Sequence, residues 1–202
     1  MKKVNKNWNE AFSKKNFGNQ FWDEFATRAQ NVAAKVVRVK TSAEAQAAIL
    51  DIITSSNAKK VVATEEVLSP GKGLAAALKM SGVAVYTAQA DIRNHADTAD
   101  VGIAGVEFGI AETGSVCEDG LAIEQRLITT LPPTSIVILN SNHIAANIQT
   151  AFEVISKVFD KGYISFITGP SRTSDIERVL TIGVHGPSQL IIIAIDEETK
   201  GV

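Results

Sequence analysis

The sequence predicts an α/β fold built on a mostly parallel sheet. Short apolar runs rich in β-branched residues alternate along the chain with stretches of helical periodicity. The last of these runs, residues 190–195, is apolar at every position, which is typical of a strand buried on both faces of a parallel sheet.

The length and composition fit one large domain. The 202 residues are 45% hydrophobic and 21% charged, as in an ordinary globular protein that buries its own core. We expect residues 1–34 to form a helical arm and residues 35–202 to form the α/β domain. The formal net charge is -2 and no run concentrates Lys or Arg, so no nucleic-acid binding is expected.

The single cysteine, Cys117, limits the redox chemistry that this chain can carry alone. An internal disulfide needs two thiols, and iron–sulfur clusters and Cys-rich zinc sites need several, so we expect no internal disulfide and no cofactor in the chain itself. No apolar run approaches the roughly 18 residues of a membrane span. No signal-peptide pattern follows the N-terminal lysines, and we therefore expect a cytoplasmic location.

The arm is rich in aromatic residues. Phe21, Phe25, Ala29 and Val32 recur at helical spacing, which predicts an amphipathic helix over residues 19–33. The arm either packs on its own domain or reaches a partner, since aromatic residues are enriched at interfaces.

The remaining pattern predicts strands with helices between them. Strands are expected over residues 35–39, 59–64, 83–87, 135–140, 163–168 and 190–195. One helix starts with a capping box, in which Glu44 stands three residues after Thr41. Another is expected over residues 73–80, ended by Gly82. A long helix before residue 163 has an apolar face made of Ile144, Ile148, Phe152, Ile155 and Phe159.

Residues 99–120 break this alternation. Five glycines are spread among Ala, Val, Ile, Phe and acidic residues, which predicts strand, turn and strand. A departure from the pattern of the fold often marks a functional segment.

The first candidate motif is Ala111-Glu112-Thr113-Gly114-Ser115, which follows an apolar run. It places a carboxylate and two hydroxyls around a flexible glycine at the end of an expected strand, where ligands bind in open α/β sheets. Glu112 is therefore a candidate catalytic group, and Thr113, Gly114 and Ser115 are candidate ligand-binding residues. The alternative is a turn whose hydroxyls satisfy the backbone.

The second motif is Thr168-Gly169-Pro170-Ser171-Arg172-Thr173-Ser174-Asp175-Ile176-Glu177. Ser174 and Glu177 form a capping box, which predicts a helix just after Ser174. Backbone N–H groups, hydroxyls and the Arg172 guanidinium would then form a site for a carboxylate or phosphate. The candidate ligand-binding residues are Thr168, Gly169, Ser171, Arg172, Thr173, Ser174 and Asp175. The alternative is a strand–turn–helix connection with Arg172 at the surface.

The third motif, Gly183-Val184-His185-Gly186-Pro187, can bring an imidazole back beside that turn. Histidine titrates near neutrality, so His185 is a second candidate catalytic group, although such a histidine can also be merely structural. His95 and His143 lack acidic or Cys companions at metal-ligand spacing and are expected at the surface or in caps, so no metal site is predicted. Cys117 is expected to be packed rather than reactive.

Together these stretches resemble the lactate-utilisation (LUD) domain family. The resemblance rests on the three motifs and on Arg126 followed by Leu131-Pro132-Pro133, in this order and separation, and covers most of residues 35–195. It implies a Rossmann-like α/β sandwich, similar to the fold of glucosamine-phosphate isomerase, ribose-phosphate isomerase and CoA-transferase. It also adds Arg126 to the candidate ligand-binding residues.

The resemblance further implies a role in oxidising lactate to pyruvate beside two partners, lactate utilisation proteins A and B. These partners would carry the iron–sulfur clusters, in agreement with the single cysteine here. The chain would be the non-redox subunit and would bind a small carboxylate or phosphate. The alternatives are an independent isomerase- or CoA-transferase-like enzyme acting on a small anionic substrate, or a scaffold without chemistry.

Overall fold

A computed structural model describes residues 14–68, 73–159, 162–173 and 181–197. Its central feature is a six-stranded sheet in the order β1-β12-β7-β4-β2-β3, in which every neighbouring pair is parallel. The strands are β1 (Lys35–Val39), β2 (Lys60–Ala63), β3 (Ala84–Tyr86), β4 (Val101–Gly105), β7 (Thr134–Asn140) and β12 (Gln189–Ile195). The predicted α/β class with a mostly parallel sheet is confirmed.

The neighbouring strands β7 and β12, which lie inside the sheet, are buried on both of its faces. Ile136 and Ile193 belong to the core on one face, and Val137 and Ile192 belong to the core on the other. Continuous apolar runs are needed at these positions because consecutive side chains point to opposite, equally buried faces.

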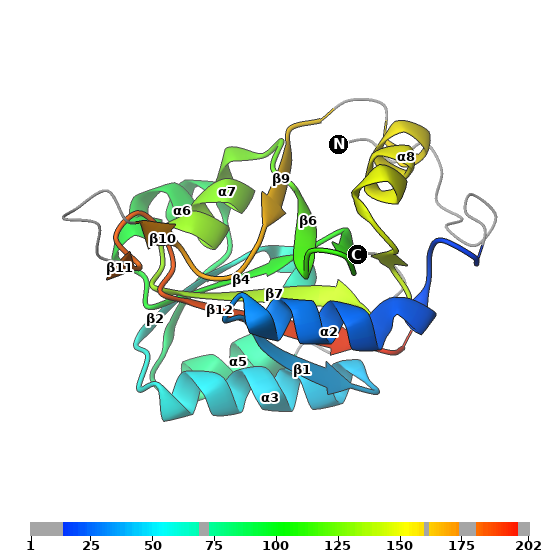
Figure 1. The fold of residues 1–202 in the computed structure, drawn as a ribbon. Coiled ribbons are helices and arrows are strands. Elements are labelled where there is room, and N and C mark those ends of the chain that lie inside the picture. The colour runs from blue at the N-terminus through cyan, green and yellow to red at the C-terminus, as the bar shows by residue number, and fades with distance from the viewer. Residues whose placement is uncertain (1–13, 69–72, 160–161, 174–180, 198–202) are drawn as a thin grey trace.

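Helices α3 (Ser42–Ser55), α4 (Glu65–Leu68) and α5 (Gly73–Met80) cover one face of the sheet; α3 and α5 lie below it in Figure 1. The predicted cap is present at the start of α3, where the Thr41 side chain accepts a hydrogen bond from Glu44 N at 3.2 Å. This bond satisfies an amide group that the first turn of a helix leaves unpaired. The Glu44 carboxylate reaches back as in a capping box, but it accepts from Lys40 N at 2.8 Å, one residue before the N-cap.

The other face is covered by helices from three parts of the chain and by a second sheet (Figure 1). The helices are α2 (Trp22–Asn31), α6 (Gln89–His95) and α7 (Ile123–Thr130). The short 3-10 turn η1 (Asn19–Phe21) precedes α2, and the 3-10 turn η2 (Ala96–Thr98) follows α6. Phe25 and Ala29 of α2 are fully buried in the core that contains Val137 and Ile192. The helix predicted in the arm therefore exists and packs on its own domain.

The second sheet has the order β8-β5-β6-β9 and is built from β5 (Phe108–Ile110), β6 (Ser115–Asp119), β8 (Ile144–Ala145) and β9 (Ile164–Ile167). Strand β6 is antiparallel to both β5 and β9, and β5 is parallel to β8. The break that the sequence shows at 99–120 is the point at which the chain leaves the parallel sheet after β4 and enters this one. The strand expected over 163–168 forms as β9, but it belongs to this second sheet.

Helix α8 (Ile148–Val158) packs on the second sheet, and the apolar face expected for it is correct only in part: Phe159 is buried in the core and Ile155 packs against it. Ile144 lies in β8, and Ile148 and Phe152 are 39% and 58% exposed. The rest of the buried face consists of Ala151, Val154 and Val158, which contact the core of this sheet. This second set also repeats at helical spacing, and periodicity alone does not choose between two adjacent stripes.

A short antiparallel ribbon joins β10 (Arg172–Thr173) to β11 (Thr181–Ile182). The helix expected after Ser174 lies outside the described residues, as do Ser174 and Asp175 themselves. Among the helices of the described residues, none is both long and apolar enough to cross a membrane.

Candidate functional site

A pocket of about 410 Å³ lies between the second sheet, helix α7 and the amino ends of β7 and β12. This volume is in the range of small-molecule sites. Five of the candidate residues line it, namely Arg126, Thr168, Gly169, Ser171 and His185. The structure thus brings the second and third motifs together with Arg126 around one cavity.

The closed part of this pocket is formed by polar side chains that are almost completely buried. Alternation along β6 directs Cys117 toward α8 and Glu118 toward the pocket. Glu118 is 1% exposed and stands opposite Ser165 of β9, and Ser135 at the start of β7 is also 1% exposed. Neither Glu118 Oε1 nor Ser135 Oγ has a hydrogen-bond partner within the described part of the chain.

The environment of Glu118 favours its protonated form. Removal from water raises the pKa of this carboxyl, and the nearby side chains of Thr129 and Gln125 oppose the increase only in part. The positive charge of Arg126 also acts to lower the pKa of Glu118, which places the guanidinium within electrostatic reach of the carboxyl. A buried acid of this kind can hold a proton at a pH where an exposed glutamate is ionised.

Arg126 and Tyr163 lie at the more exposed part of the pocket. The Arg126 guanidinium carbon is 4.6 Å from the centroid of the Tyr163 ring, a cation–π contact that holds the guanidinium in place. Tyr163 is 54% exposed. Gly120 leaves room for this arrangement, because a Cβ there would lie 3.1 Å from Tyr163 Cδ1 and 3.2 Å from Arg126 Cγ. An anion that enters the pocket would therefore meet a guanidinium.

The 168–171 turn and the 183–187 loop are joined by backbone hydrogen bonds. Ser171 N donates to Pro187 O at 2.8 Å, and Gly183 N donates to Ser171 O at 2.9 Å. The prediction that this loop returns beside the turn is confirmed. His185 is exposed and lines the pocket.

The Glu112 motif does not line this pocket. Glu112 is exposed, and its Oε2 accepts a hydrogen bond from Ile148 N at 3.0 Å, at the first residue of α8. A carboxylate there stabilises the positive end of the helix. The link to the pocket is indirect: Ser115 Oγ donates to Thr113 Oγ1 at 2.8 Å and shares a hydrogen bond of 2.6 Å with Thr168 Oγ1, at the pocket wall.

Two glycines of the motifs allow helix α2 to approach. Gly114 has φ +67°, and a Cβ on it would lie 2.2 Å from Ala29 N. Gly169 has φ +70°, and a Cβ on it would lie 2.2 Å from Val32 O. Any larger residue would both strain the backbone and collide with main-chain atoms of α2 or of its C-terminus.

Arg172 also contacts the end of α2. Its Nη2 donates to Val32 O at 2.6 Å, at the C-cap of the helix, and the side chain is exposed. A cation is favourable at this negative end of the helix. Arg172 and Thr173, which lie in β10, are not among the pocket residues, so the role of Arg172 as an anion ligand stays a prediction.

Sequence reasoning missed Glu118, Thr129, Ser135, Tyr163 and Ser165, all of which line the pocket. Glu118 could have been recognised from the sequence, because it directly follows the apolar pair Val116 and Cys117 in an expected strand. A charged residue at such a position either is buried or lies where the strand turns away from the core. The other four residues become recognisable only when the second sheet is placed over α7 and β7.

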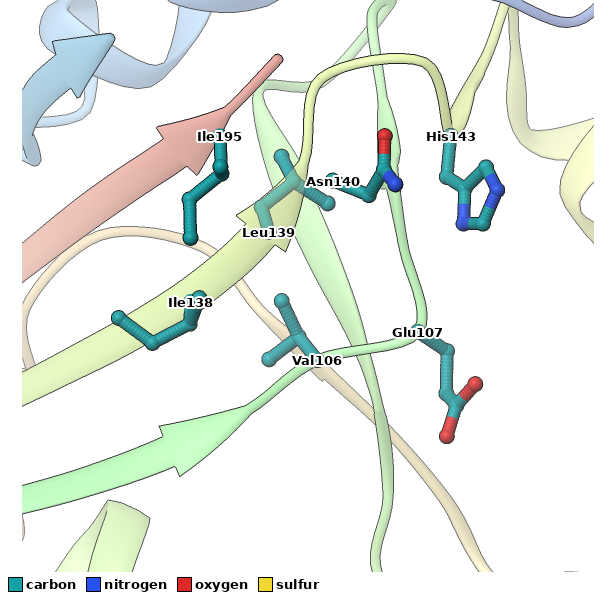
Figure 2. A pocket seen from close by; sticks show the side chains of 7 residues that line it. All are labelled: Val106, Glu107, Ile138, Leu139, Asn140, His143 and Ile195. Atoms are coloured by element: carbon teal, nitrogen blue, oxygen red, sulfur yellow. The ribbon is translucent and has the colours of Figure 1, made fainter. Parts of the chain in front are cut away.

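A much smaller hollow lies at the carboxyl ends of β7 and β12, opposite to the ends that line the large pocket. Figure 2 shows its apolar side chains from β7 and β12, with Glu107 and His143 at its border. Its volume of about 20 Å³ has room for about one water molecule and not for an organic ligand. Although ligands of open α/β sheets usually bind at the carboxyl ends of the parallel strands, the larger pocket here lies at the amino ends of β7 and β12.

Cys117 and His95 lie outside the pocket and pack against neighbouring side chains. Cys117 is fully buried, and burial together with the charges of Glu107, Asp119 and Glu118 raises the pKa of its thiol, so it is packed as predicted. His95 stacks on Tyr86 with ring centroids 3.9 Å apart. In the ranges that the structure describes, no three His, Cys, Asp or Glu side chains gather as a metal site would require.

The sequence of this domain matches a known family. A family model described as LUD domain matches residues 22–195. The chain belongs to the LUD domain family. The match begins in α2 and thus includes the packed helix of the arm, and it ends with β12.

Several relatives of this LUD domain share one name. Lactate utilization protein C of Shouchella clausii is 29% identical over 163 residues, which cover 78% of this chain and 71% of that protein. Lactate utilization protein C of Geobacillus kaustophilus is 36% identical over 107 residues, which cover 50% of this chain and 45% of that protein. The resemblance to this lactate-utilisation family is confirmed.

The fold of this LUD domain also has a solved counterpart. A DUF162 family protein from Deinococcus radiodurans has a crystal structure that superposes with a TM-score of 0.60 at 20% sequence identity, covering 87% of this chain and 96% of that one. This similarity supports the α/β sandwich.

Proposed function

We propose that this LUD domain is the non-redox component of a cytoplasmic lactate-utilisation system. In this proposal it supports oxidation of lactate to pyruvate beside lactate utilisation proteins A and B, whose iron–sulfur clusters would carry the electrons. The observation that carries the proposal is the similarity to proteins called lactate utilization protein C. The one cysteine of the chain is buried, which is consistent with electron transfer in other subunits.

The pocket is the place where such a component would bind its small anion. Arg126 offers a planar guanidinium that matches a carboxylate. Glu118 can hold or accept a proton at the closed part of the pocket, because burial raises its pKa. His185 is the second candidate acid or base, at the exposed part.

Growth on lactate tests the proposed function. A strain lacking this chain should fail to grow with lactate as the carbon source and should recover when the wild-type chain is returned. The tagged wild-type chain should also co-purify with iron–sulfur proteins. Growth of the deletion strain on lactate at the normal rate would remove the proposal.

A pair of arginine variants tests the assigned site within the same strain. Arg126→Ala should abolish growth on lactate, because it removes the guanidinium that lines the pocket. Arg172→Ala is the comparison variant, because Arg172 is the other predicted anion ligand and its described contact is with Val32 O and not with the pocket. Retained growth in this variant, beside lost growth in Arg126→Ala, would assign the anion to Arg126. Loss of growth only with Arg172→Ala would place the anion site in the turn after β9 instead.

A second candidate is an independent enzyme of the isomerase or CoA-transferase type. The pocket volume of about 410 Å³ favours it, because this exceeds what a three-carbon acid fills, and a buried acid stands in its wall. Incubation of the isolated protein with sugar phosphates or with an acyl-CoA and a free acid tests this candidate. Turnover that is lost in Glu118→Gln would support it, and the absence of turnover with either class would exclude it.

A further inference from the structure

Two side chains in the pocket wall each carry a buried polar atom that lacks a hydrogen-bond partner among the described residues. Glu118 and Ser135 are each 1% exposed, and Glu118 Oε1 and Ser135 Oγ make no hydrogen bond with the described residues. More than nine in ten buried polar groups in folded proteins do have a partner. The two atoms come from different sheets, yet both side chains line the same cavity. A ligand in this cavity is therefore a candidate for the missing partner of each atom.

The chemistry of these two side chains limits what that group can be. A serine hydroxyl donates and accepts, and a carboxyl does both when protonated. Burial raises the pKa of Glu118, so this carboxyl keeps its proton to a higher pH than an exposed glutamate does. A ligand carboxylate could only accept and would be repelled whenever Glu118 is ionised, and a ligand ammonium would be repelled by Arg126. A neutral hydroxyl can donate to one of the two residues and accept from the other.

The rest of the lining adds an anionic group and further polar contacts. Arg126, held on the Tyr163 ring at 4.6 Å, is the cation of the exposed part. Thr129, Ser165, Thr168 and Ser171 add hydroxyls to the wall. Alcohol groups of a ligand would find donors and acceptors along this wall.

We infer that the pocket is selective for hydroxylated organic anions, with the anionic end at Arg126 and a hydroxyl bound by Glu118 and Ser135. The inference rests on the proposed function and deepens it, since lactate is a 2-hydroxy acid. It adds two specificity-determining residues, neither of which belongs to the three sequence motifs.

Titration calorimetry with matched ligands tests the inference on the full-length protein. L-lactate and propionate have the same carboxylate and carbon count and differ only in the hydroxyl, and gluconate provides a longer hydroxylated anion. We expect at least one of L-lactate and gluconate to bind the wild type roughly tenfold or more tightly than propionate, since a site built around a hydroxyl leaves its polar groups unpaired when the hydroxyl is missing. Equal affinity for the three acids, or no binding of any, would overturn the inference.

Two buried serines provide the variant and its control. Ser135→Ala should reduce the preference for the hydroxylated acid by roughly fivefold or more, while the fold stays intact because the deleted hydroxyl has no hydrogen-bond partner among the described residues. Ser141→Ala is the control: its hydroxyl is also 1% exposed but donates to Asp196 Oδ1 at 2.6 Å, away from the pocket. It should lower stability and leave the preference unchanged. An unaltered preference in Ser135→Ala would also overturn the inference.

These outcomes differ from a failure of the proposed function. A protein that restores growth on lactate but does not distinguish the acids would keep the proposed function and remove the inference. A deletion strain that grows normally on lactate would remove the proposed function. In that case, a preference for gluconate over propionate would still support a pocket for hydroxylated anions.

Discussion

Gly114→Ala should destabilise the protein by forcing helix α2 away from the second sheet. The residue has φ +67°, and the new Cβ would lie 2.2 Å from Ala29 N and 2.4 Å from Arg28 C. Both are backbone atoms, so no side chain can rotate to relieve the contact. The helix itself has to move, and it carries the fully buried Phe25 and Ala29.

The expected loss has two parts. A non-glycine residue in the left-handed region costs about 1–2 kcal/mol. Removing a buried Phe side chain completely costs about 3–5 kcal/mol, and a partial displacement of Phe25 and its helix takes roughly half of that. The total is about 2.5–4.5 kcal/mol. For a domain of this size, each kcal/mol lowers Tm by about 2–4 °C, so a decrease of roughly 5–18 °C is expected.

Gly82→Ala is the matched control for this experiment. Gly82 has φ +78°, and among the described residues other than its two chain neighbours no heavy atom lies within 4 Å of the position of its Cβ. This variant should show only the conformational cost of about 1–2 kcal/mol. Urea denaturation of both variants measures the difference directly. Equal losses of stability in the two would refute the conclusion that Gly114 is required for the close approach of α2.

Four further predictions concern single side chains. Burial raises the pKa of Glu118 above its ordinary value of 4.5, so the folded protein loses stability relative to Glu118→Gln as the pH rises above that value. Urea denaturation between about pH 4 and pH 8 should show the stabilities of the two proteins diverging, and parallel curves would contradict the raised pKa. Arg172→Ala should lower the free energy of unfolding by about 0.5–1 kcal/mol through its lost bond to the C-cap of α2, measured by denaturation, and a neutral result would make that contact unimportant. Cys117, buried and with a raised pKa, should react with a thiol reagent only after denaturation, and labelling of the native protein would contradict its burial. Glu112→Gln should cost less than about 1 kcal/mol, because an amide oxygen can still accept the bond at the start of α8; a collapse in Tm would make the carboxylate a structural requirement.

The parallel sheet could be predicted because its signals are local. A run such as Lys35–Val39 carries its own β-branched pattern, and the helix Gly73–Met80 begins and ends where the sequence indicates. The second sheet could not be assigned in the same way. Its β6–β9 pair joins Glu118 to Ser165 across a long stretch of chain, and no local pattern specifies that pairing.

The site was predicted in part, for the same physical reason. The turn at Thr168 and the loop at His185 carry recognisable Gly and Pro signals, and the structure brings both to one pocket. The roles of Gly114 and Gly169 were not visible, because a sequence shows that a glycine is present but not which backbone approaches it. Here that backbone belongs to α2 and its C-terminus. Ser135 gave no signal, because it becomes notable only through its hydroxyl, which has no hydrogen-bond partner in the part of the chain that the structure describes.

The most direct test of the central claim is to locate the bound anion by NMR. The claim is that ligands bind between the second sheet and α7, not at the carboxyl ends of the parallel strands. Titration of the isotope-labelled protein with L-lactate, and with gluconate if lactate is too weak, should shift the backbone amide signals of Glu118, Thr129 and Ser135. Shifts confined to the hollow of Figure 2, at Glu107 and His143, would contradict the claim.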